Sequence, residues 1–109
     1  MEQTVGRKDL LSVLLNQSIS NVEVKEITIP AGGKAAYHLH PCPVVGYVSS
    51  GTVLFQIEGE PKEIFQEGCA FYEPKDKPIV HFDNASKTEP LTFIAFYLRE
   101  EEEDFITIL

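Results

Sequence analysis

The sequence of 109 residues lacks several features that would place it in other classes of protein. It contains no tryptophan, one methionine, two cysteines and three histidines. No apolar run approaches the roughly eighteen residues of a membrane-spanning helix, and its first residues lack the basic-then-apolar layout of a secretion signal. Cys42 and Cys69 are too few for the disulfide framework of a small secreted domain. We therefore expect a cytoplasmic protein whose two thiols stay reduced.

Positive charge is also scarce. Nine Lys and Arg residues face 17 Asp and Glu residues, which gives a net charge of −8. This excess repels phosphate backbones and anionic lipids, so we expect neither nucleic acid nor a membrane as a partner. Arg7 and Arg99 are the only arginines, so none is available in the middle of the chain to hold a phosphate group.

The chain is long enough for one domain, and its pattern changes twice along its length. Residues 1–21 contain a short leucine stripe, typical of a helix of about two turns or of an extended arm. Residues 22–98 carry the body of the domain. Residues 99–109 begin as an acidic tail and end in an apolar, strand-prone stretch.

The body consists of short apolar stretches separated by glycine, proline and asparagine turns. One strand is expected to begin at Val22, and the other stretches are 34–40, 44–49, 52–58, 63–66, 69–73, 78–82 and 91–98. Many short strands with turns between them predict an all-β, antiparallel sandwich or barrel. The apolar end of the tail should pair with a sheet edge, its own or a partner's, because a free edge strand promotes aggregation. We accordingly expect a homodimer.

The three histidines are His38, His40 and His81. In a strand, His38 and His40 would project from one face, because side chains alternate with period two. His81 lies in a later apolar stretch, and three imidazoles on neighbouring strands can converge on one ion. Cys42, two residues after His40, is either a soft ligand, a redox group or a small apolar core residue.

These residues fall in a recognisable pattern. The chain resembles a small single-domain cupin of the RmlC-like jelly-roll superfamily, which implies an antiparallel double-stranded β-helix. The first cupin motif is matched by Gly32, His38, His40 and Gly51, and the second by Gly68, Pro74, His81 and Asn84, with Asp76 in place of a glycine. The resemblance covers roughly residues 22–98.

Two departures from the family pattern concern the metal site. Val44 stands where the first motif carries a glutamate ligand, and His81 comes two residues later after Pro74 than the second motif requires. Glu73, just before Pro74, shares a face with Phe71 by period two. Its carboxylate could serve as a fourth ligand or as a base near the metal, or it could point to solvent from the strand end.

A site of three neutral imidazoles favours Fe(II), Ni(II), Zn(II) or Co(II), and we expect a divalent transition metal, with iron, nickel, zinc and manganese as candidates. The ligand set resembles that of cupin thiol dioxygenases, which implies an oxygenase acting on a small organic molecule in an apolar pocket. Glu73, Tyr72 or Cys42 would transfer protons. A ligand-binding or sensor module without catalysis, and a metal-dependent isomerase or lyase, are the alternatives.

Overall fold

The computed structural model describes residues 4–109, and these residues form strands and loops without a helix. The described residues form nine strands: β1 (Asn21–Ile29), β2 (His38–Leu39), β3 (Val44–Ser50), β4 (Thr52–Ile57), β5 (Glu63–Gln66), β6 (Ala70–Glu73), β7 (Ile79–Asn84), β8 (Leu91–Arg99) and β9 (Thr107–Ile108). No helix among the described residues is long and apolar enough to cross a membrane.

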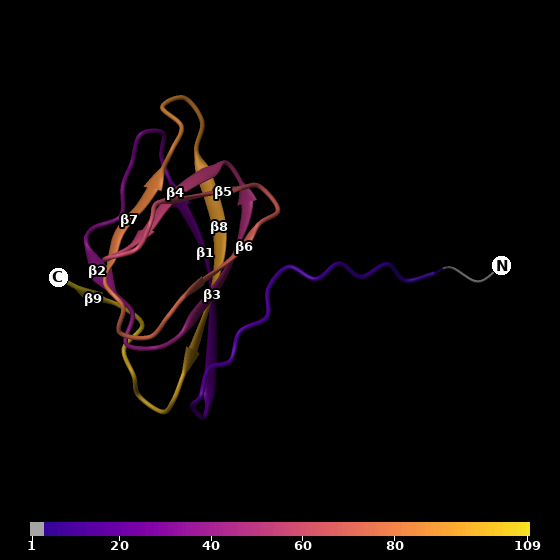
Figure 1. Ribbon diagram of the computed structural model, residues 1–109, viewed down its shortest axis with the longest axis vertical. Coiled ribbons are helices and arrows are strands. Elements are labelled where there is room, and N and C mark those ends of the chain that lie inside the picture. Colours follow the sequence, from indigo (N-terminus) through magenta and orange to yellow (C-terminus); the bar gives the residue numbers. More distant parts are fainter. Residues whose placement is uncertain (1–3) are drawn as a thin grey trace.

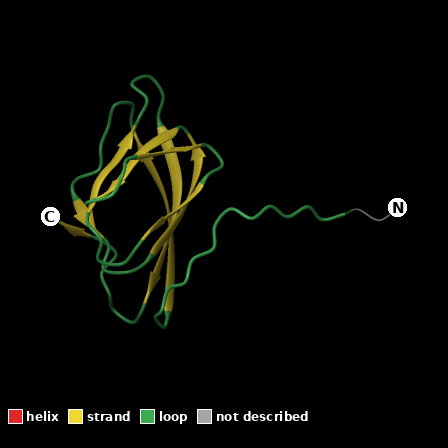
Figure 2. Ribbon diagram, viewed as in Figure 1, coloured by secondary structure: helices red, strands yellow, loops and turns green. Residues whose placement is uncertain are grey.

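The strands form two antiparallel sheets that face each other (Figures 1 and 2). One sheet has the order β1-β8-β3-β6 and the other the order β5-β4-β7-β2-β9. Apart from the consecutive strands β4 and β5, neighbours in each sheet are not consecutive in sequence, as in a jelly roll, where the chain passes between the two layers. The predicted all-β, antiparallel double-stranded β-helix is confirmed.

Most strands lie where the apolar stretches predicted them, and the stretch 34–40 is the main exception. Only His38–Leu39 of that stretch is a strand, and Lys34 forms an isolated bridge with Asp83. Pro41 follows directly and cannot donate to a β-ladder, which limits how far β2 continues.

Residues 4–20 precede β1 as an extended arm that runs away from the barrel (Figure 1). Residues 1–3 of the predicted segment 1–21 lie outside the described residues. The side chains of Leu10, Leu11 and Leu14 are 47%, 39% and 89% exposed, so these leucines are not buried against the barrel. A helix of about two turns is marginal without such docking, which explains why the arm is extended.

The core lies between the sheets, where alternating side chains from both layers meet. Val48 and Phe55 are fully buried there. Gly46 also faces inward, and a Cβ atom at this position would lie 2.0 Å from Cζ of Phe71. Glycine is therefore required at this point for the Phe71 ring to cross the β3 backbone.

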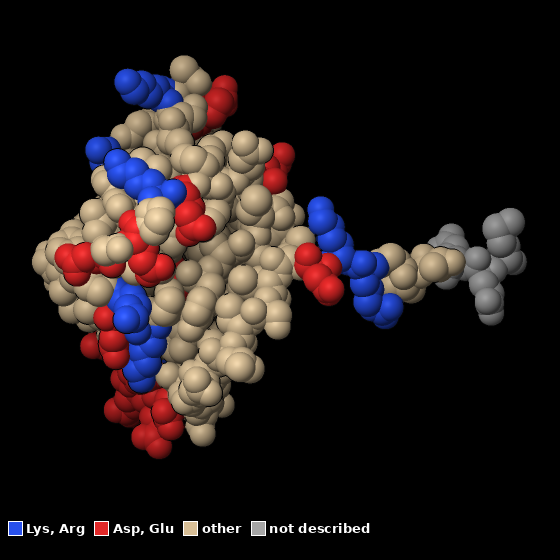
Figure 3. Space-filling view, in the orientation of Figure 1, with Lys and Arg blue, Asp and Glu red and all other residues tan. Residues whose placement is uncertain are grey.

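The outer face of the four-stranded sheet carries exposed apolar side chains, and residues 4–109 form no further layer that covers it. Val22, Val24 and Tyr47 are 54%, 57% and 39% exposed there. Charged side chains gather mainly elsewhere on the face drawn in Figure 3, and the part of the body nearest to the arm is largely uncharged. A second layer of apolar side chains could cover this surface.

Candidate metal centre

The two sheets bring three of the predicted site residues together. His38 lies in β2 and His40 just after it, while Glu73 is the last residue of β6 in the facing sheet. Each of the three offers a ligand atom, and these atoms all lie within 4.8 Å of one another. The residues are 4%, 5% and 3% exposed. Two imidazoles and one carboxylate thus converge inside the barrel and could hold a metal ion.

Strand pairing explains how Glu73 supplies a carboxylate where the cupin motif has lost one. In the β3–β6 ladder, Val44 is the direct partner of Glu73. Paired residues project from the same face of an antiparallel sheet. The carboxylate therefore enters the barrel from the strand next to the motif position, and Glu73 does not point to solvent.

Both imidazole rings are oriented by backbone carbonyl groups. Nδ1 of His38 lies 2.6 Å from the carbonyl oxygen of Ala36, and Nδ1 of His40 lies 2.5 Å from that of Phe105. A carbonyl oxygen only accepts, so each Nδ1 carries a proton and donates it. A neutral ring then has its lone pair on Nε2, and this arrangement is characteristic of metal-binding histidines.

Nε2 of His40 lies 2.6 Å from Oε2 of Glu73. Two lone pairs cannot approach so closely in a buried site, so a proton lies between them in the metal-free protein. Burial alone would lower the pKa of His40, but the hydrogen bond and charge of Glu73 and the Phe105 carbonyl outweigh it and raise this pKa.

A metal ion can replace this proton. Ligand atoms at about 2.0–2.2 Å from an ion, at right angles, stand about 3 Å apart, a few tenths more than the present separation of Nε2 and Oε2. The donor set, its burial and its spacing therefore fit a divalent ion.

The structure does not bring His81 to this group. Its side chain is 28% exposed and its Nδ1 lies 2.9 Å from Oδ2 of Asp83. The neighbouring Phe82 lines the cavity, so His81 points away from it. The β4–β7 ladder has a register shift at this point: His81 pairs with Gln56, whereas Ile79 pairs with Ile57. This irregularity breaks the regular alternation of side chains along β7. As a result Ile79, and not His81, is the β7 residue opposite His38.

Tyr72 and Cys42 also lie outside the group. Tyr72 alternates with Phe71 and Glu73, which point inward, so it lies on the outer face of its sheet. Cys42 has no exposed surface and belongs to the hydrophobic core. Burial, and secondarily the charge of Glu103, raises the pKa of its thiol to about 11, which suits an inert core residue better than a ligand or redox group.

Tyr97 was not predicted as a site residue, yet it lies beside the site. It is paired with Val44 across the β3–β8 ladder, and its ring centroid lies 5.7 Å from that of His40. Burial, followed by the charge of Glu73, raises the pKa of Tyr97 to about 12. Alternation along the predicted strand 91–98 places Tyr97 on the face of Phe93 and Ala95, which is the signal that could have identified it.

The site opens into a cavity of about 200 Å³. Among the lining residues that the structure describes, Lys34 is the one Lys or Arg. Most of the wall is apolar, with contributions from Ile27, Ile29, Phe71, Phe82, Phe93, Ala95 and Ile106. The cavity suits a small organic molecule with at most one anionic group.

Residues 25–97 match the family model described as a cupin domain. No curated protein matches the chain. Solved structures with the same fold include a cupin-like protein from Thermotoga maritima, with 22% identity and a TM-score of 0.70 over 82% of this chain and 65% of that one. A DMSP lyase from Ruegeria pomeroyi has 21% identity and a TM-score of 0.67 over 80% of this chain and 42% of that one.

A structure of oxalate oxidase has 22% identity and a TM-score of 0.66 over 81% of this chain and 46% of that chain. The present chain thus spans less than two thirds of each of these three structures. At such identities the likeness shows the fold.

Proposed function

This chain belongs to the cupin domain family, and we propose that it is a metal-dependent enzyme that acts on a small organic molecule in the barrel. The observation that carries the proposal is the buried cluster of His38, His40 and Glu73, whose ligand atoms lie within 4.8 Å of one another. Two histidines and one carboxylate with open positions are the ligand set of non-haem Fe(II) oxygenases. We therefore favour an oxygenase.

The inclusion of Glu73 changes the expected preference for metals. A carboxylate lowers the net charge of the site and adds a hard oxygen donor, which strengthens the case for manganese among the four predicted ions. When bound, such an ion supplies Lewis-acid or redox chemistry at its open positions.

The protein's own residues bind and orient the substrate. The apolar wall excludes water and holds the hydrocarbon part of the molecule. Lys34 can pair with an anionic group, since it lines the same cavity. With a pKa of about 12, the Tyr97 hydroxyl stays protonated at neutral pH and can donate a hydrogen bond to a substrate oxygen.

A metal-dependent lyase or isomerase is the second candidate, and Tyr97 favours it, because a proton donor beside the ligand cluster suits chemistry without oxygen. A DMSP lyase and an oxalate oxidase share this fold, so the fold does not choose between them.

The state of the cysteines bears on where the protein works. Both cysteines are unpaired, which supports our expectation of a reducing, cytoplasmic location.

The test is turnover by the Fe(II)-loaded protein of a panel of small thiols, carbonyl compounds and carboxylates, with and without oxygen. Oxygen consumption that is lost in His40→Ala and kept in His81→Ala would support the oxygenase. Turnover that continues without oxygen would support the lyase or isomerase. If the loaded protein binds members of the panel without converting them, the proposal of an enzyme is overturned. The protein would then be a binding or sensor module.

A further inference from the structure

Residues 100–109, which we call the strap, connect the two sheets on the side of the barrel that holds the metal cluster. The strap leaves β8, runs round the lower end of the body in Figure 1 and ends as β9 on β2. We propose that the strap is a working part of the metal site, because it positions His40 as a ligand and closes the cavity. This inference rests on the proposed function, since it assumes that the cluster binds a metal.

The direct contact of the strap with the metal cluster is made by its backbone. The carbonyl oxygen of Phe105 accepts the hydrogen bond from Nδ1 of His40 at 2.5 Å. This bond fixes the ring so that Nε2 points at Glu73. In the same stretch Ile108 pairs with His38, and the amide of Leu109 donates to the carbonyl of Tyr37 at 3.0 Å. The strap thus contacts the chain from Tyr37 to His40, the stretch that carries both histidines.

Side chains of the strap complete the wall of the cavity. Ile106 is one of the lining residues. The ring of Phe105 meets that of Tyr97 edge to face, with centroids 5.4 Å apart, and the Lys25 ammonium lies 4.8 Å from the centroid of the Phe105 ring. Moving the strap would therefore displace a partner of Tyr97, open the cavity and release His40 together.

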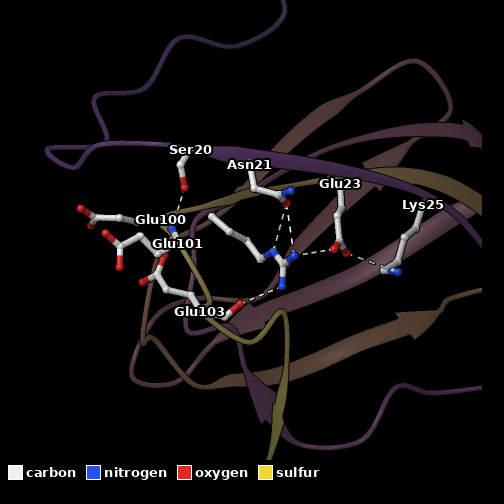
Figure 4. A network of polar contacts seen from close by, with 8 residues as sticks. Ser20, Asn21, Glu23, Lys25, Glu100, Glu101 and Glu103 are labelled. Atoms are coloured by element: carbon white, nitrogen blue, oxygen red, sulfur yellow. Dashed lines mark hydrogen bonds and ion pairs between the residues drawn. The ribbon is translucent and has the colours of Figure 1, made fainter.

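The start of the strap is held by polar contacts to Arg99 at the end of β8 and to Ser20 just before β1 (Figure 4), and by a contact to Lys75 just after β6. Nη1 of Arg99 donates to the carbonyl of Glu103 at 2.8 Å, and the amide of Glu101 donates to Oγ of Ser20 at 2.6 Å. Lys75 donates to Oε2 of Glu103 at 2.5 Å. Since Lys75 lies two residues after Glu73, this ion pair ties the strap to the strand end that carries the carboxylate ligand.

Groups that orient a metal-binding histidine through its second nitrogen commonly change metal affinity by about 10- to 100-fold when removed. We expect an effect of this size for the strap, because it supplies the partner of His40. Removal of residues 105–109 also removes β9, which pairs with β2. This truncation should therefore change the coordination of the bound ion as well as its affinity.

The experiment is a Co(II) titration that follows both affinity and the visible spectrum of the bound ion. The variants are the chain ended after Asp104, the chain ended after Ile106, Glu103→Ala and the matched control Glu102→Ala. Glu102 is an exposed strap glutamate, so its variant changes the net charge as Glu103→Ala does. Circular dichroism and thermal midpoints of the metal-free proteins are measured in parallel.

The chain ended after Asp104 is expected to bind Co(II) about 10- to 100-fold more weakly, with a changed spectrum. The chain ended after Ile106, which keeps Phe105 without its β9 anchor, should lie between this variant and the intact protein. If the shorter chains fail to fold, the comparison of Glu103→Ala with Glu102→Ala tests the inference. We then expect Glu103→Ala to bind Co(II) about tenfold more weakly and Glu102→Ala to bind it as the intact protein does.

Equal affinity and an unchanged spectrum in all folded variants would overturn the inference, even if their thermal midpoints fall. If the intact protein itself bound no Co(II), the proposed function would fail instead.

Discussion

Replacing Glu73 with glutamine removes one buried negative charge and keeps the shape of the side chain. In the metal-free protein the proton on Nε2 of His40 bridges to Oε2 of Glu73 at 2.6 Å, with side chains 6% and 4% exposed. The glutamine carbonyl can still accept this proton, so the hydrogen bond survives without the charge of its acceptor. The change therefore tests the charge of the pair with little change in packing.

Two effects of different size follow. A hydrogen bond to a charged group contributes about 1.5–3 kcal/mol and a neutral one about 0.5–1.5 kcal/mol, so Glu73→Gln should lower the free energy of unfolding of the metal-free protein by about 1–1.5 kcal/mol. Loss of a direct ligand should weaken metal binding more than loss of an orienting group does, by at least about 100-fold or about 2.8 kcal/mol.

The stability effect has a definite dependence on pH. The folded protein raises the pKa of His40 above its ordinary value of 6.5. The stabilisation by the pair is therefore fully present below pH 6.5 and is lost as the pH rises through the pKa of His40 in the folded state. The difference in unfolding free energy between the intact protein and Glu73→Gln should shrink over the same pH range.

Asp83→Asn provides a matched control. Asp83 is 5% exposed and accepts a hydrogen bond from Nδ1 of His81 at 2.9 Å, but it lies outside the metal cluster. Urea unfolding at several pH values gives stability, and competition with a chelator gives affinity for Co(II). If Glu73→Gln bound Co(II) as tightly as the intact protein, or if Asp83→Asn weakened binding equally, the assignment of Glu73 as a ligand would be refuted.

Further predictions concern the rest of the molecule. Cys69 should react with a thiol reagent at pH 8 well before Cys42, whose thiol is buried and has a pKa of about 11; equal rates would contradict its place in the core. Gly46→Ala should lower the free energy of unfolding by about 1–3 kcal/mol through the clash with Phe71, and an unchanged urea midpoint would refute that packing. We also expect light scattering to give twice the mass of one 12.2 kDa chain, with Val24→Lys shifting the mass toward one chain; a monomeric intact protein would argue against a dimer.

The sequence was informative where structure depends on local pattern. Alternating apolar residues and Gly/Pro turns located most of the strands, because strand geometry and turn chemistry act over a few residues. The spacing of His38 and His40 likewise predicted two imidazoles close together.

The carboxylate and the third histidine depended on strand register, which local pattern does not reveal. The pairing of Val44 with Glu73 unites residues from two strands, and only this pairing shows that the carboxylate replaces the missing motif glutamate. The shift in the β4–β7 ladder turns His81 away from the cavity. Its displacement from the cupin spacing was visible in the sequence, whereas the resulting change of face was not.

No pattern of side chains in the sequence predicted the contact between the strap and His40. It is made by the main-chain carbonyl of Phe105, a group that every residue possesses. The apolar character of residues 105–109 did predict pairing with a sheet edge, and the strand they form pairs with β2 of the same chain.

Elemental analysis of the purified protein tests the central claim most directly, because it reports on the ligands without knowledge of the substrate. The samples are the intact protein, His81→Ala and the triple variant with alanine at His38, His40 and Glu73. We expect roughly one equivalent of iron, manganese, nickel or zinc in the first two and almost none in the third. Loss of metal in His81→Ala, or no metal in the intact protein even after reconstitution, would contradict the account.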